Sequence, residues 1–485
     1  MPPVADLAAE LRALVGEDAV LVSVEACTPF ECDALNTQRH RPDLVVLPRT
    51  ASAVLDVLRA CRRRSVPVVA RGAGTGLSGG ALPVAGGVLL VLSRLDRILE
   101  IDVARRLARV EPGVTNLGIS QAVAGHGLYY APDPSSQVAC TIGGNVAENS
   151  GGVHCLKHGL TVHNVLAARV ATMDGEELVL GSTSGEAPGL PLLALVTGSE
   201  GMLGVVLEVT VLLKPRPARV ELLLAAFGDV RRAADAVGRI IASGVVPAGL
   251  EMMDAPAIRA AEAFVRCGYP VDAEALLLCE LDGLPADVER DLDAVRRLLL
   301  DCGATSLRVA ASEAERLRMW SGRKSAFPAV GRLAPDYFCM DGTIPRRHLA
   351  DVLERIAELS REAGLPVANV FHAGDGNLHP LILFDAGRAG DVERAEHLGA
   401  AILELCVAVG GTVTGEHGVG VEKLGPMCTQ FGAGELEAFH AVKHAFDPAG
   451  LLNPGKAVPT LARCADYGAM RVHGGKLPFG HLPRF

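Results

Sequence analysis

Aromatic residues and paired cysteines are scarce in this 485-residue chain. Aromatic side chains make up only 4% of it, while apolar residues reach 49%, so we expect an aliphatic core. The 12 cysteines are scattered, and none forms a Cys-x-x-Cys pair. A disulfide framework is therefore not expected in so long a chain without a secretion signal. The clustered thiolates of an iron–sulfur centre are missing too, so any onward transfer of single electrons requires another chain.

Positive charge, an export signal and a membrane span are also missing. The net charge of −10 argues against nucleic acid as a partner. Residues 1–6 lack the basic-then-apolar pattern of a signal peptide. No uncharged apolar run approaches the ~20 residues needed to cross a bilayer. A cytoplasmic protein is predicted, and docking onto a membrane partner remains open.

Length and local pattern indicate more than one domain. For 485 residues, two or three domains are expected. Short apolar strands alternate with amphipathic helices, as at residues 43–47 and in the helix that Thr50 caps after them. This alternation predicts an α+β protein. The Pro-rich segment 214–217 is the clearest boundary, because the pattern restarts beyond it with a strand at 220–226 and a helix at 230–242.

Two histidines flank a short turn in the most informative segment, residues 370–380. Asp375-Gly376 is a favoured two-residue hairpin loop, because both positions tolerate positive φ. A hairpin centred on that pair makes His372 and His379 direct cross-strand neighbours, with Cβ atoms roughly 5 Å apart. A helix is less suitable here, because the glycines in the segment would weaken it. The two imidazoles are therefore predicted to share one metal ion.

Glu416, in the Gly-flanked pair Glu416-His417, is the best candidate for a third ligand. Two histidines and one carboxylate leave open coordination positions, which is typical of a catalytic rather than a structural site. Neighbouring side chains on a strand point to opposite faces, but the flanking glycines favour a loop. The alternative is that all these residues belong to an ordinary hairpin and loop without a metal.

A glycine-rich loop at residues 72–80 follows a predicted strand. It contains G-x-G-x-x-G at Gly74, Gly76 and Gly79, the spacing of a dinucleotide fingerprint. A Rossmann site needs a helix directly afterwards, whereas Pro83 and another strand follow here. We therefore reject a Rossmann site and keep phosphate binding, since clustered backbone N–H groups form an anion-binding nest. The alternative is a glycine-rich turn without a ligand.

Two further loops rich in Gly, Ser and Asn lie in the same half, at residues 132–152 and 197–204. Three such loops in one domain suit a long ligand that is touched mainly by backbone groups. FAD, with its pyrophosphate and wide isoalloxazine, is such a ligand.

These three loops resemble the FAD-binding domain of the vanillyl-alcohol oxidase/PCMH flavoprotein family. The later half resembles the FAD-linked oxidase C-terminal domain, through residues 320–324, 340–347, 369–385, 415–418 and 446–456. Within that family the likeness is to FAD-containing catalytic (D) subunits of bacterial glycolate oxidase, with D-lactate and D-2-hydroxyglutarate dehydrogenases as relatives. It implies a lead-in at 1–40, a PCMH-type FAD-binding domain at 41–217, a substrate and metal domain at 218–440, and a C-terminal segment at 441–485 that returns to the FAD domain.

The resemblance implies a role for each motif. His417 would be the general base, Arg323 would hold the substrate carboxylate, and His372, His379 and Glu416 would bind a divalent metal, whether zinc, iron or manganese. FAD should be non-covalent, because Thr75 stands where some relatives attach it through a histidine. The residues implied in FAD binding are Arg71, Gly72, Ala73, Gly74, Thr75, Gly76, Leu77, Ser78, Gly79, Pro132, Asp133, Thr141, Gly143, Gly144, Asn145, Asn149, Gly151, Glu200, Gly201, Val206 and Asn453.

The resemblance also implies an activity, the FAD-dependent oxidation of a short 2-hydroxy acid, most specifically glycolate to glyoxylate. Relatives that act on dicarboxylates carry threonine and lysine where this chain has Phe327 and either Cys339 or Met340, which favours a short monocarboxylate. Electrons would pass through a second flavin-domain subunit and an iron–sulfur subunit to quinone, at the inner face of the cytoplasmic membrane. The alternatives are an FAD-linked D-lactate dehydrogenase, a non-catalytic flavin electron-transfer subunit, and a metallohydrolase with an unrelated nucleotide-binding domain.

Overall fold

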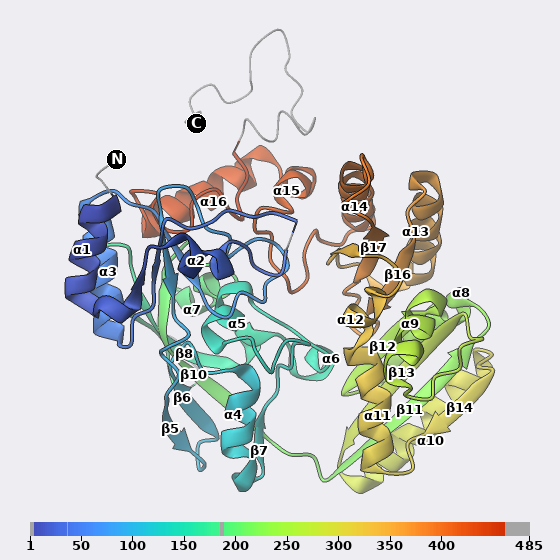
Figure 1. Ribbon diagram of the computed structural model, residues 1–485. Helices are drawn as coiled ribbons and strands as arrows, with labels where there is room; N and C mark the ends of the chain where they lie inside the picture. Colours follow the sequence, from blue (N-terminus) through green and yellow to red (C-terminus); the bar gives the residue numbers. More distant parts are fainter. Residues whose placement is uncertain (1–3, 36, 185–188, 461–485) are drawn as a thin grey trace. The chain divides into compact units, whose positions relative to one another are not determined.

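Two units make up the described part of the chain (Figure 1), which in this computed structural model comprises residues 4–35, 37–184 and 189–460. The first unit takes in the described residues up to Gly151, Leu160–Arg216 and those from Glu416 on, and the second takes in Gly152–Gly159 and Pro217–Gly415. The segment that returns to the first unit thus begins at Glu416, whereas the sequence places this return at residue 441. Residues 461–485 of the predicted C-terminal segment lie outside the described residues.

Apolar runs form the parallel part of the first sheet. Its strand order is β1-β2-β4-β3, in which β2, β4 and β3 are parallel. β2 and β4 are buried along their whole length, as is usual for parallel strands. Helix α3 (Ala51–Arg63) begins where predicted, because Thr50 Oγ1 accepts a hydrogen bond from Ala53 N at 3.2 Å. The strands are β1 (Val20–Leu21), β2 (Leu44–Val46), β3 (Val68–Arg71) and β4 (Val88–Val91).

Strand β10 (Val205–Pro215) is the centre of the second sheet. The order is β5-β6-β10-β8-β9, and β7 also pairs with β10. All these pairings are antiparallel, and the inward side chains of β10, such as Val209 and Val211, are fully buried. The other strands are β5 (Ile98–Asp102), β6 (Leu107–Val110), β7 (Leu128–Tyr130), β8 (Val165–Ala171) and β9 (Glu177–Gly181).

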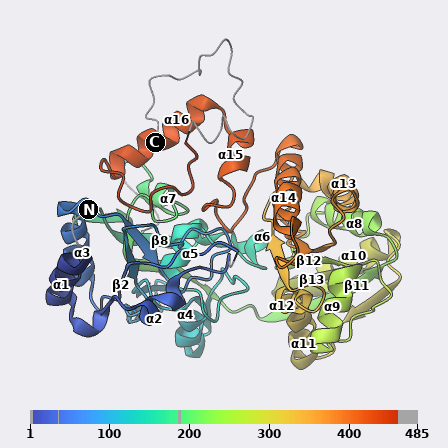
Figure 2. The same ribbon diagram turned by 45° about the horizontal axis from the view of Figure 1, so that its top comes forward.

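The returning segment adds two helices to the first unit, α15 (Leu424–Gln430) and α16 (Ala433–Phe446). Val442 and Phe446 pack on a core cluster that includes Val170 of β8. Figure 2 shows α16 lying over α7 and β8. The other helices of this unit are α1 (Val4–Val15), α2 (Val24–Cys27), α4 (Asn116–Val123), α5 (Ile142–Glu148) and α7 (Leu192–Val196).

A seven-stranded sheet organises the second unit, in the order β14-β11-β13-β12-β16-β17-β15. Every pairing in it is antiparallel. The central strands are almost continuously apolar and buried, so both faces of the sheet are covered. The strands are β11 (Arg219–Phe227), β12 (Gly249–Asp254), β13 (Ala275–Gly283), β14 (Ser306–Val309), β15 (Asp336–Cys339), β16 (Val367–Phe371) and β17 (Pro380–Phe384).

Helix α8 (Val230–Ala242) has the bounds that the sequence predicts. Asp229 caps it by accepting from Arg231 N at 2.8 Å, and Val237 and Ile240 lie on its buried face. It packs against β11, β12 and β13, while α10 packs against β11 and β13. The other helices are α6 (Cys155–His158), α9 (Ala255–Val265), α10 (Pro285–Asp301), α11 (Glu313–Lys324), α12 (Ala326–Val330), α13 (Leu349–Ala363) and α14 (Asp391–Ala408).

The long helices and the cysteines bear on membrane spans and disulfides. Over the described ranges, no helix is both long enough and apolar enough to cross a membrane. Ten cysteines there are free thiols, and eight of these are buried, whereas Cys428 takes part in a disulfide. The buried thiols therefore belong to the apolar core and do not crosslink it.

The interior of α8 provides a test of local stability. A Cβ at Gly238 would project into open space. Because glycine weakens a helix interior, Gly238→Ala should raise the free energy of unfolding by about 0.5–1 kcal/mol, measured by urea unfolding. The control is Gly376→Ala, which should destabilise the protein, because Gly376 has φ +84° and a Cβ there would lie 2.3 Å from the carbonyl O of Ile344. A Gly238→Ala protein no more stable than wild type would contradict this account.

Candidate functional site

The histidine hairpin forms, but its register differs from the predicted one. β16 and β17 pair antiparallel, with His372 opposite Asn377. Val370 N donates to His379 O at 3.4 Å, so Val370 is the residue opposite His379. The prediction that His372 and His379 are directly paired is therefore wrong by two residues.

The turn itself explains the shift. It is a loop over residues 373–376, closed by Gly376 N donating to His372 O at 3.1 Å. Gly376 alone takes a positive φ there, whereas the predicted turn requires it at Asp375 too. The close approach of Gly376 to Ile344 O leaves no room for a side chain. Packing against a distant segment thus selects a longer loop than Asp-Gly chemistry suggests.

The two imidazoles nevertheless lie on one face of the hairpin. A shift of two residues preserves the face, because side chains alternate along a strand with period two. The ring centroids of His372 and His379 lie 5.1 Å apart at an interplanar angle of 85°. His372 is 5% exposed and His379 is 1% exposed. The structure therefore brings them together as diagonal neighbours.

Each imidazole is oriented through its Nδ1 atom. His372 Nδ1 lies 2.7 Å from Glu251 Oε1, and His379 Nδ1 lies 3.4 Å from Met340 O. Since both partners are acceptors, they favour the ring proton on Nδ1 and an unprotonated Nε2. Metal-binding histidines usually donate their other N–H to a carboxylate or carbonyl in this way. The chemistry of the donor set fits a divalent metal.

Glu251 links this histidine pair to a buried arginine. Its Oε2 accepts from Arg323 Nε at 2.8 Å and lies 2.7 Å from Arg323 Nη2, while Oε1 faces His372. Burial alone would raise the pKa of Glu251, but the interactions of Glu251 with His372 and Arg323 outweigh this effect and hold that pKa below its usual value. Glu251 is thus an ionised carboxylate at the centre of the cluster.

Arg323, on α11, retains a nitrogen for a ligand. The side chain is 1% exposed, and within the described residues its buried Nη1 has no hydrogen-bond partner. A buried donor without an acceptor is unfavourable, so an anionic ligand would complete this group. Phe327 follows four residues later, and its ring meets that of His379 edge-on at 6.2 Å. An apolar ring therefore lies beside the histidine pair.

Asp341 fixes the segment that precedes Glu416. It is fully buried, and its Oδ1 accepts from Asn377 Nδ2 at 3.0 Å. Its Oδ2 accepts from Gly415 N at 3.0 Å and from Thr414 Oγ1 at 2.5 Å. A Cβ on Gly415 would lie 2.3 Å from Asn377 Nδ2, so only glycine permits this contact. Asp341 thereby ties the hairpin turn to Gly415.

Glu416 and His417 come next, in an irregular loop, as predicted. His417 Nε2 lies 3.9 Å from Glu416 Oε1, so the two side chains project to the same side. The side chains are 12% and 14% exposed, respectively. His417 O accepts a hydrogen bond from Ser78 Oγ at 3.0 Å.

The glycine-rich loop offers a row of unused backbone donors. Residues 72–80 connect β3 to an irregular segment before β4, so no helix follows the fingerprint and the rejection of a Rossmann site is confirmed. In the described part of the chain, no backbone N–H of residues 72–80 donates a hydrogen bond. Thr141 Oγ1 is buried without a partner there, beside the position that a Cβ on Gly72 would occupy. These donors fit an anionic ligand held by backbone amides.

The remaining residues predicted to bind FAD all lie in the first unit. Some of them also hold that unit together. Asn116 Nδ2 donates to Pro132 O at 3.0 Å and to Asn145 Oδ1 at 3.2 Å, and Asn149 Oδ1 accepts from Val162 N at 2.9 Å. The others end β3 (Arg71), belong to α5 (Gly143, Gly144) or β10 (Val206), or lie in loops (Asp133, Gly151, Glu200, Gly201 and Asn453).

Two carboxyl groups lie beside the glycine-rich loop. Glu200 is 5% exposed and accepts two backbone N–H groups at 2.7 Å each. Glu148 Oε2 is buried, and no described residue donates to it. Burial, followed by the negative charges of Glu200 and Asp33, raises the pKa of Glu148 well above its ordinary value. Glu148 therefore keeps its proton at pH values where an exposed glutamate has lost it.

Glu251, Asp341 and Glu148 are the functional candidates that sequence reasoning missed. The available signal for Glu251 is an acid inside the apolar run of residues 250–253, where a charge requires a partner. Asp341 and Glu148 stand in the recognised segments 340–347 and 132–152, but their partners lie far away in the sequence.

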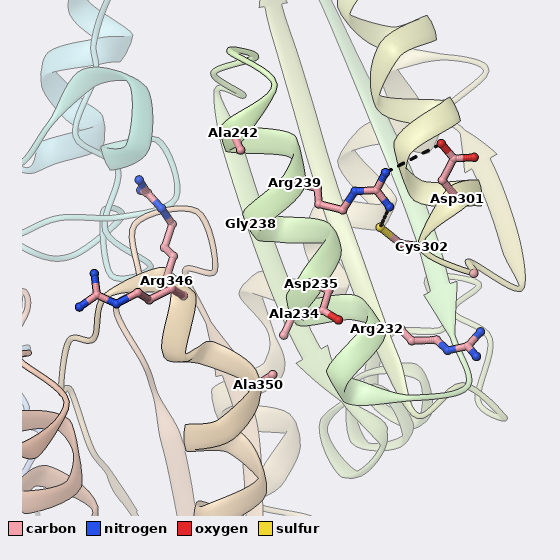
Figure 3. A pocket seen from close by; sticks show the side chains of 12 residues that line it. Arg232, Ala234, Asp235, Gly238, Arg239, Ala242, Asp301, Cys302, Arg346 and Ala350 are labelled. Atoms are coloured by element: carbon pink, nitrogen blue, oxygen red, sulfur yellow. Dashed lines mark hydrogen bonds and ion pairs between the residues drawn. The ribbon is translucent and has the colours of Figure 1, made fainter.

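A groove of about 710 Å³ on the second unit is lined by none of the predicted site residues (Figure 3). It lies over α8 and is bordered by several arginines. Arg239 faces Cys302 Sγ at 3.3 Å and Asp301 at 4.0 Å, and Arg346 Nη1 donates to Gly374 O at 2.8 Å. In the figure, Arg239 and Arg346 point away from each other on opposite sides of α8. The arginines do not converge, so the groove is not the candidate site.

Comparison with known proteins identifies both halves of the chain. The FAD binding domain family matches residues 42–181, and the FAD linked oxidases, C-terminal domain family matches residues 216–457. The glycolate oxidase subunit GlcD of Escherichia coli (strain K12) is 63% identical, over 96% of this chain and 93% of that protein. A D-lactate dehydrogenase of Anaerostipes hadrus is 31% identical, over 90% of this chain and 94% of that protein.

The fold agrees with this. The structure of p-cresol methylhydroxylase with substrate bound superposes with a TM-score of 0.78 at 17% identity, over 94% of this chain and 97% of that one. The chain belongs to the FAD-linked oxidase family. The predicted α+β class and PCMH-type FAD-binding domain are confirmed, and the unused donors of residues 72–80 and Thr141 suit the pyrophosphate of FAD.

The cluster around Glu251 gives a stability prediction. Glu251→Gln should lower the free energy of unfolding by about 3–5 kcal/mol, because it leaves the buried Arg323 without a counter-charge. The pKa of Glu251 is lowered in the folded state, so its stabilisation is present above the unfolded pKa and is lost as pH falls through the folded pKa. Denaturant unfolding should therefore show a smaller difference in the free energy of unfolding between Glu251→Gln and wild type in acid than at neutral pH.

The matched control is Glu354→Gln. Glu354 also pairs with an arginine, Arg231, but both side chains are exposed. Exposed ion pairs contribute little, so this variant should unfold like wild type. Equal effects of the two substitutions would contradict a central role for Glu251.

Glu148 gives a prediction of opposite pH dependence. Its pKa is raised in the folded state, so its contribution to stability is fully present below the unfolded pKa and is lost as pH rises through the folded pKa. Glu148→Gln, which cannot ionise, should therefore have a melting temperature close to wild type in acid and a higher one in mild alkali. Thermal melts across that pH range measure it. A melting-temperature difference that does not change with pH would refute the raised pKa.

Proposed function

We propose that this protein oxidises a short 2-hydroxy acid, most specifically glycolate to glyoxylate, with FAD as the electron acceptor. The observation that carries the proposal is the buried Arg323–Glu251–His372 chain, which sets an anion-binding cation beside two histidines. A 2-hydroxy acid has the matching groups, a carboxylate and a neighbouring hydroxyl. The 63% identity to a glycolate oxidase subunit supports the same substrate.

Arg323 would bind the substrate carboxylate. Glu251 occupies its Nε edge and holds the guanidinium in place, which leaves Nη1 pointing to no described acceptor. A charge-assisted hydrogen bond from Nη1 would then orient the substrate. Because Glu251 also orients His372, the carboxylate and the hydroxyl would be positioned by one rigid group.

His372 and His379 would hold a divalent metal together with Glu416. Their Nδ1 contacts support this, and so does Asp341, which anchors the backbone directly before Glu416. When bound, such a metal supplies Lewis-acid polarisation that lowers the pKa of a coordinated hydroxyl. Two nitrogens and one carboxylate are compatible with zinc, iron or manganese.

His417 would act as the general base for the 2-hydroxyl proton. An imidazole titrates near neutral pH, as that role requires. Its side chain projects to the same side as Glu416, and its backbone is anchored through Ser78. The amides of residues 72–80 would hold FAD non-covalently, and FAD would supply the hydride-accepting chemistry at the substrate C2.

Phe327 supports a short substrate. Its ring lies against His379 where dicarboxylate-specific relatives carry a polar residue, so a second carboxylate would lose hydration without gaining a partner. D-Lactate remains the second candidate, since a relative at 31% identity is a D-lactate dehydrogenase. The two substrates differ by one methyl group, which is worth only ~1–3 kcal/mol of discrimination.

The protein would work within a complex. The similar protein from Escherichia coli is named as a subunit, and the scattered cysteines of this chain do not provide an iron–sulfur site. We propose that a second flavin-domain subunit and an iron–sulfur subunit carry electrons to quinone at the inner face of the cytoplasmic membrane.

Anaerobic flavin bleaching tests this function. Purified protein is mixed with glycolate, D-lactate, L-lactate or D-2-hydroxyglutarate, with and without a chelator, and flavin absorbance is followed. Glycolate should bleach the flavin fastest, D-lactate should follow, the dicarboxylate should react poorly, and the chelator should slow every reaction. Bleaching by D-2-hydroxyglutarate alone, or none by any acid, would reject the proposal.

Variants separate the roles. His417→Ala should slow bleaching by about 10²–10⁴-fold, the usual contribution of a general base, with FAD content unchanged. Arg323→Ala should raise the substrate concentration needed for half-maximal bleaching. A purely electron-transferring subunit would tolerate both changes, and a metallohydrolase would not be yellow.

A further inference from the structure

We propose that Ser78 and Glu200 are positioning residues for His417, and that they fix the loop of residues 416–423 onto the glycine-rich FAD loop. This loop of residues 416–423 is called the base loop below. The inference rests on the proposed role of His417 and goes beyond it: Ser78 and Glu200 would serve catalysis through the base loop instead of by touching the flavin.

Ser78 makes hydrogen bonds to the base loop on both sides of Gly418 and Gly420. The residue is fully buried, and its Oγ donates to His417 O at 3.0 Å. Its carbonyl O accepts from Val421 N at 2.9 Å and from Glu422 N at 3.2 Å. One residue of the glycine-rich loop therefore holds the base loop immediately before and after residues 418–420.

Glu200 holds the middle of the base loop. Its Oε1 accepts from Val419 N and its Oε2 accepts from Gly420 N, both at 2.7 Å. Both distances are typical of charge-assisted hydrogen bonds, which are shorter and stronger than neutral ones. Each carboxylate oxygen thus serves one amide, and neither a serine nor a glutamine could reproduce both contacts, since each side chain provides a single acceptor atom of this reach.

The backbone at Glu200 supports a dedicated role. Its φ is +51°, a left-handed conformation that favours glycine, in a turn that already contains Gly198 and Gly201. A non-glycine residue there is strained and persists only where the surroundings require it. The required feature is the carboxylate, because the backbone alone would be better served by glycine.

Close backbone contacts and two buried lysines also hold the base loop and the glycine-rich loop together. A Cβ on Gly420 would lie 2.0 Å from Ser78 O, so the two loops touch through their main chains. Lys423 is fully buried and its Nζ donates to Gly418 O at 2.8 Å. Lys456 Nζ donates to Gly80 O at 3.1 Å and to Leu82 O at 2.7 Å. Burial raises the pKa of Glu200, and the two backbone N–H groups and both lysines oppose that rise.

Asn453 adds further hydrogen bonds between Glu200, Lys456 and the glycine-rich loop. Its Nδ2 donates to Gly80 O at 2.9 Å and to Glu200 O at 2.6 Å, and its Oδ1 accepts from Lys456 Nζ at 2.8 Å. The tail residue predicted to reach the flavin thus ties the backbone of Glu200 to the end of the glycine-rich loop.

Hydrogen exchange of the FAD-loaded protein tests the proposal. In Glu200→Gln and in Ser78→Ala, peptides covering residues 416–423 should exchange about tenfold faster or more, the scale of one lost hydrogen bond to a charged group. The ratio of flavin to protein should stay at the wild-type value. In steady-state assays, kcat for glycolate should fall while KM changes little, because substrate binding does not use these residues.

The matched control is Glu208→Gln. Glu208 is a carboxylate of the same unit, on β10, paired with Arg109 and Arg169. The Glu208→Gln substitution should leave both the amide hydrogen exchange of residues 416–423 and kcat unchanged. Ser78→Ala removes a single hydroxyl and provides the same readout should Glu200→Gln fail to fold.

Other outcomes would overturn the proposal. Loss of FAD from Glu200→Gln with unchanged exchange in residues 416–423 would make Glu200 a flavin ligand. Unchanged exchange in both variants would make the contacts incidental. Failure of the proposed function would be seen separately, as normal turnover in His417→Ala. The amide hydrogen exchange of residues 416–423 measures how firmly the base loop is held and does not depend on turnover.

Discussion

The ionised carboxylate of Glu251, buried between Arg323 and His372, is the interaction on which the candidate site depends. A charge enclosed in protein is tolerated only when opposite charges and hydrogen bonds surround it. Here that requirement fixes both neighbours, because neither can move without exposing a buried charge to an apolar core. The same requirement explains why the guanidinium of Arg323 is rigid while one of its nitrogens stays available. The stability of the cluster and its proposed capacity to bind a substrate carboxylate therefore both depend on Glu251.

A second constraint acts where the chain passes from one unit to the other. Gly415 is held by Asp341 of the second unit, and two residues later His417 is held by Ser78 of the first. Only Glu416 and its peptide bonds lie between these anchors. The proposed third ligand and the proposed base are thus adjacent in sequence to backbone groups that each unit holds by hydrogen bonds of its own.

Much of this arrangement can be predicted from local sequence, and the exceptions have a common cause. Helix α8 and the cap at Thr50 follow from periodicity and capping. The hairpin was predicted, but its register was wrong, because Ile344 O packs against Gly376 and favours a longer turn. Glu251 and Asp341 could not be assigned, since their partners lie far away in the chain. Local sequence pattern predicts helices and strands. Which acidic residues belong to the candidate site depends on buried charge pairs between residues far apart in the chain.

The position of the unit boundary has a consequence for how such proteins can be recombined. The boundary after Gly415 separates the two histidines and Arg323 from Glu416 and His417. A chimera that exchanged whole units between two relatives would therefore inherit the proposed base, His417, from the parent of the FAD domain and the proposed substrate arginine, Arg323, from the other parent. Substrate preference and proton chemistry would be inherited separately, so diversification of substrate range in this architecture need not disturb the base.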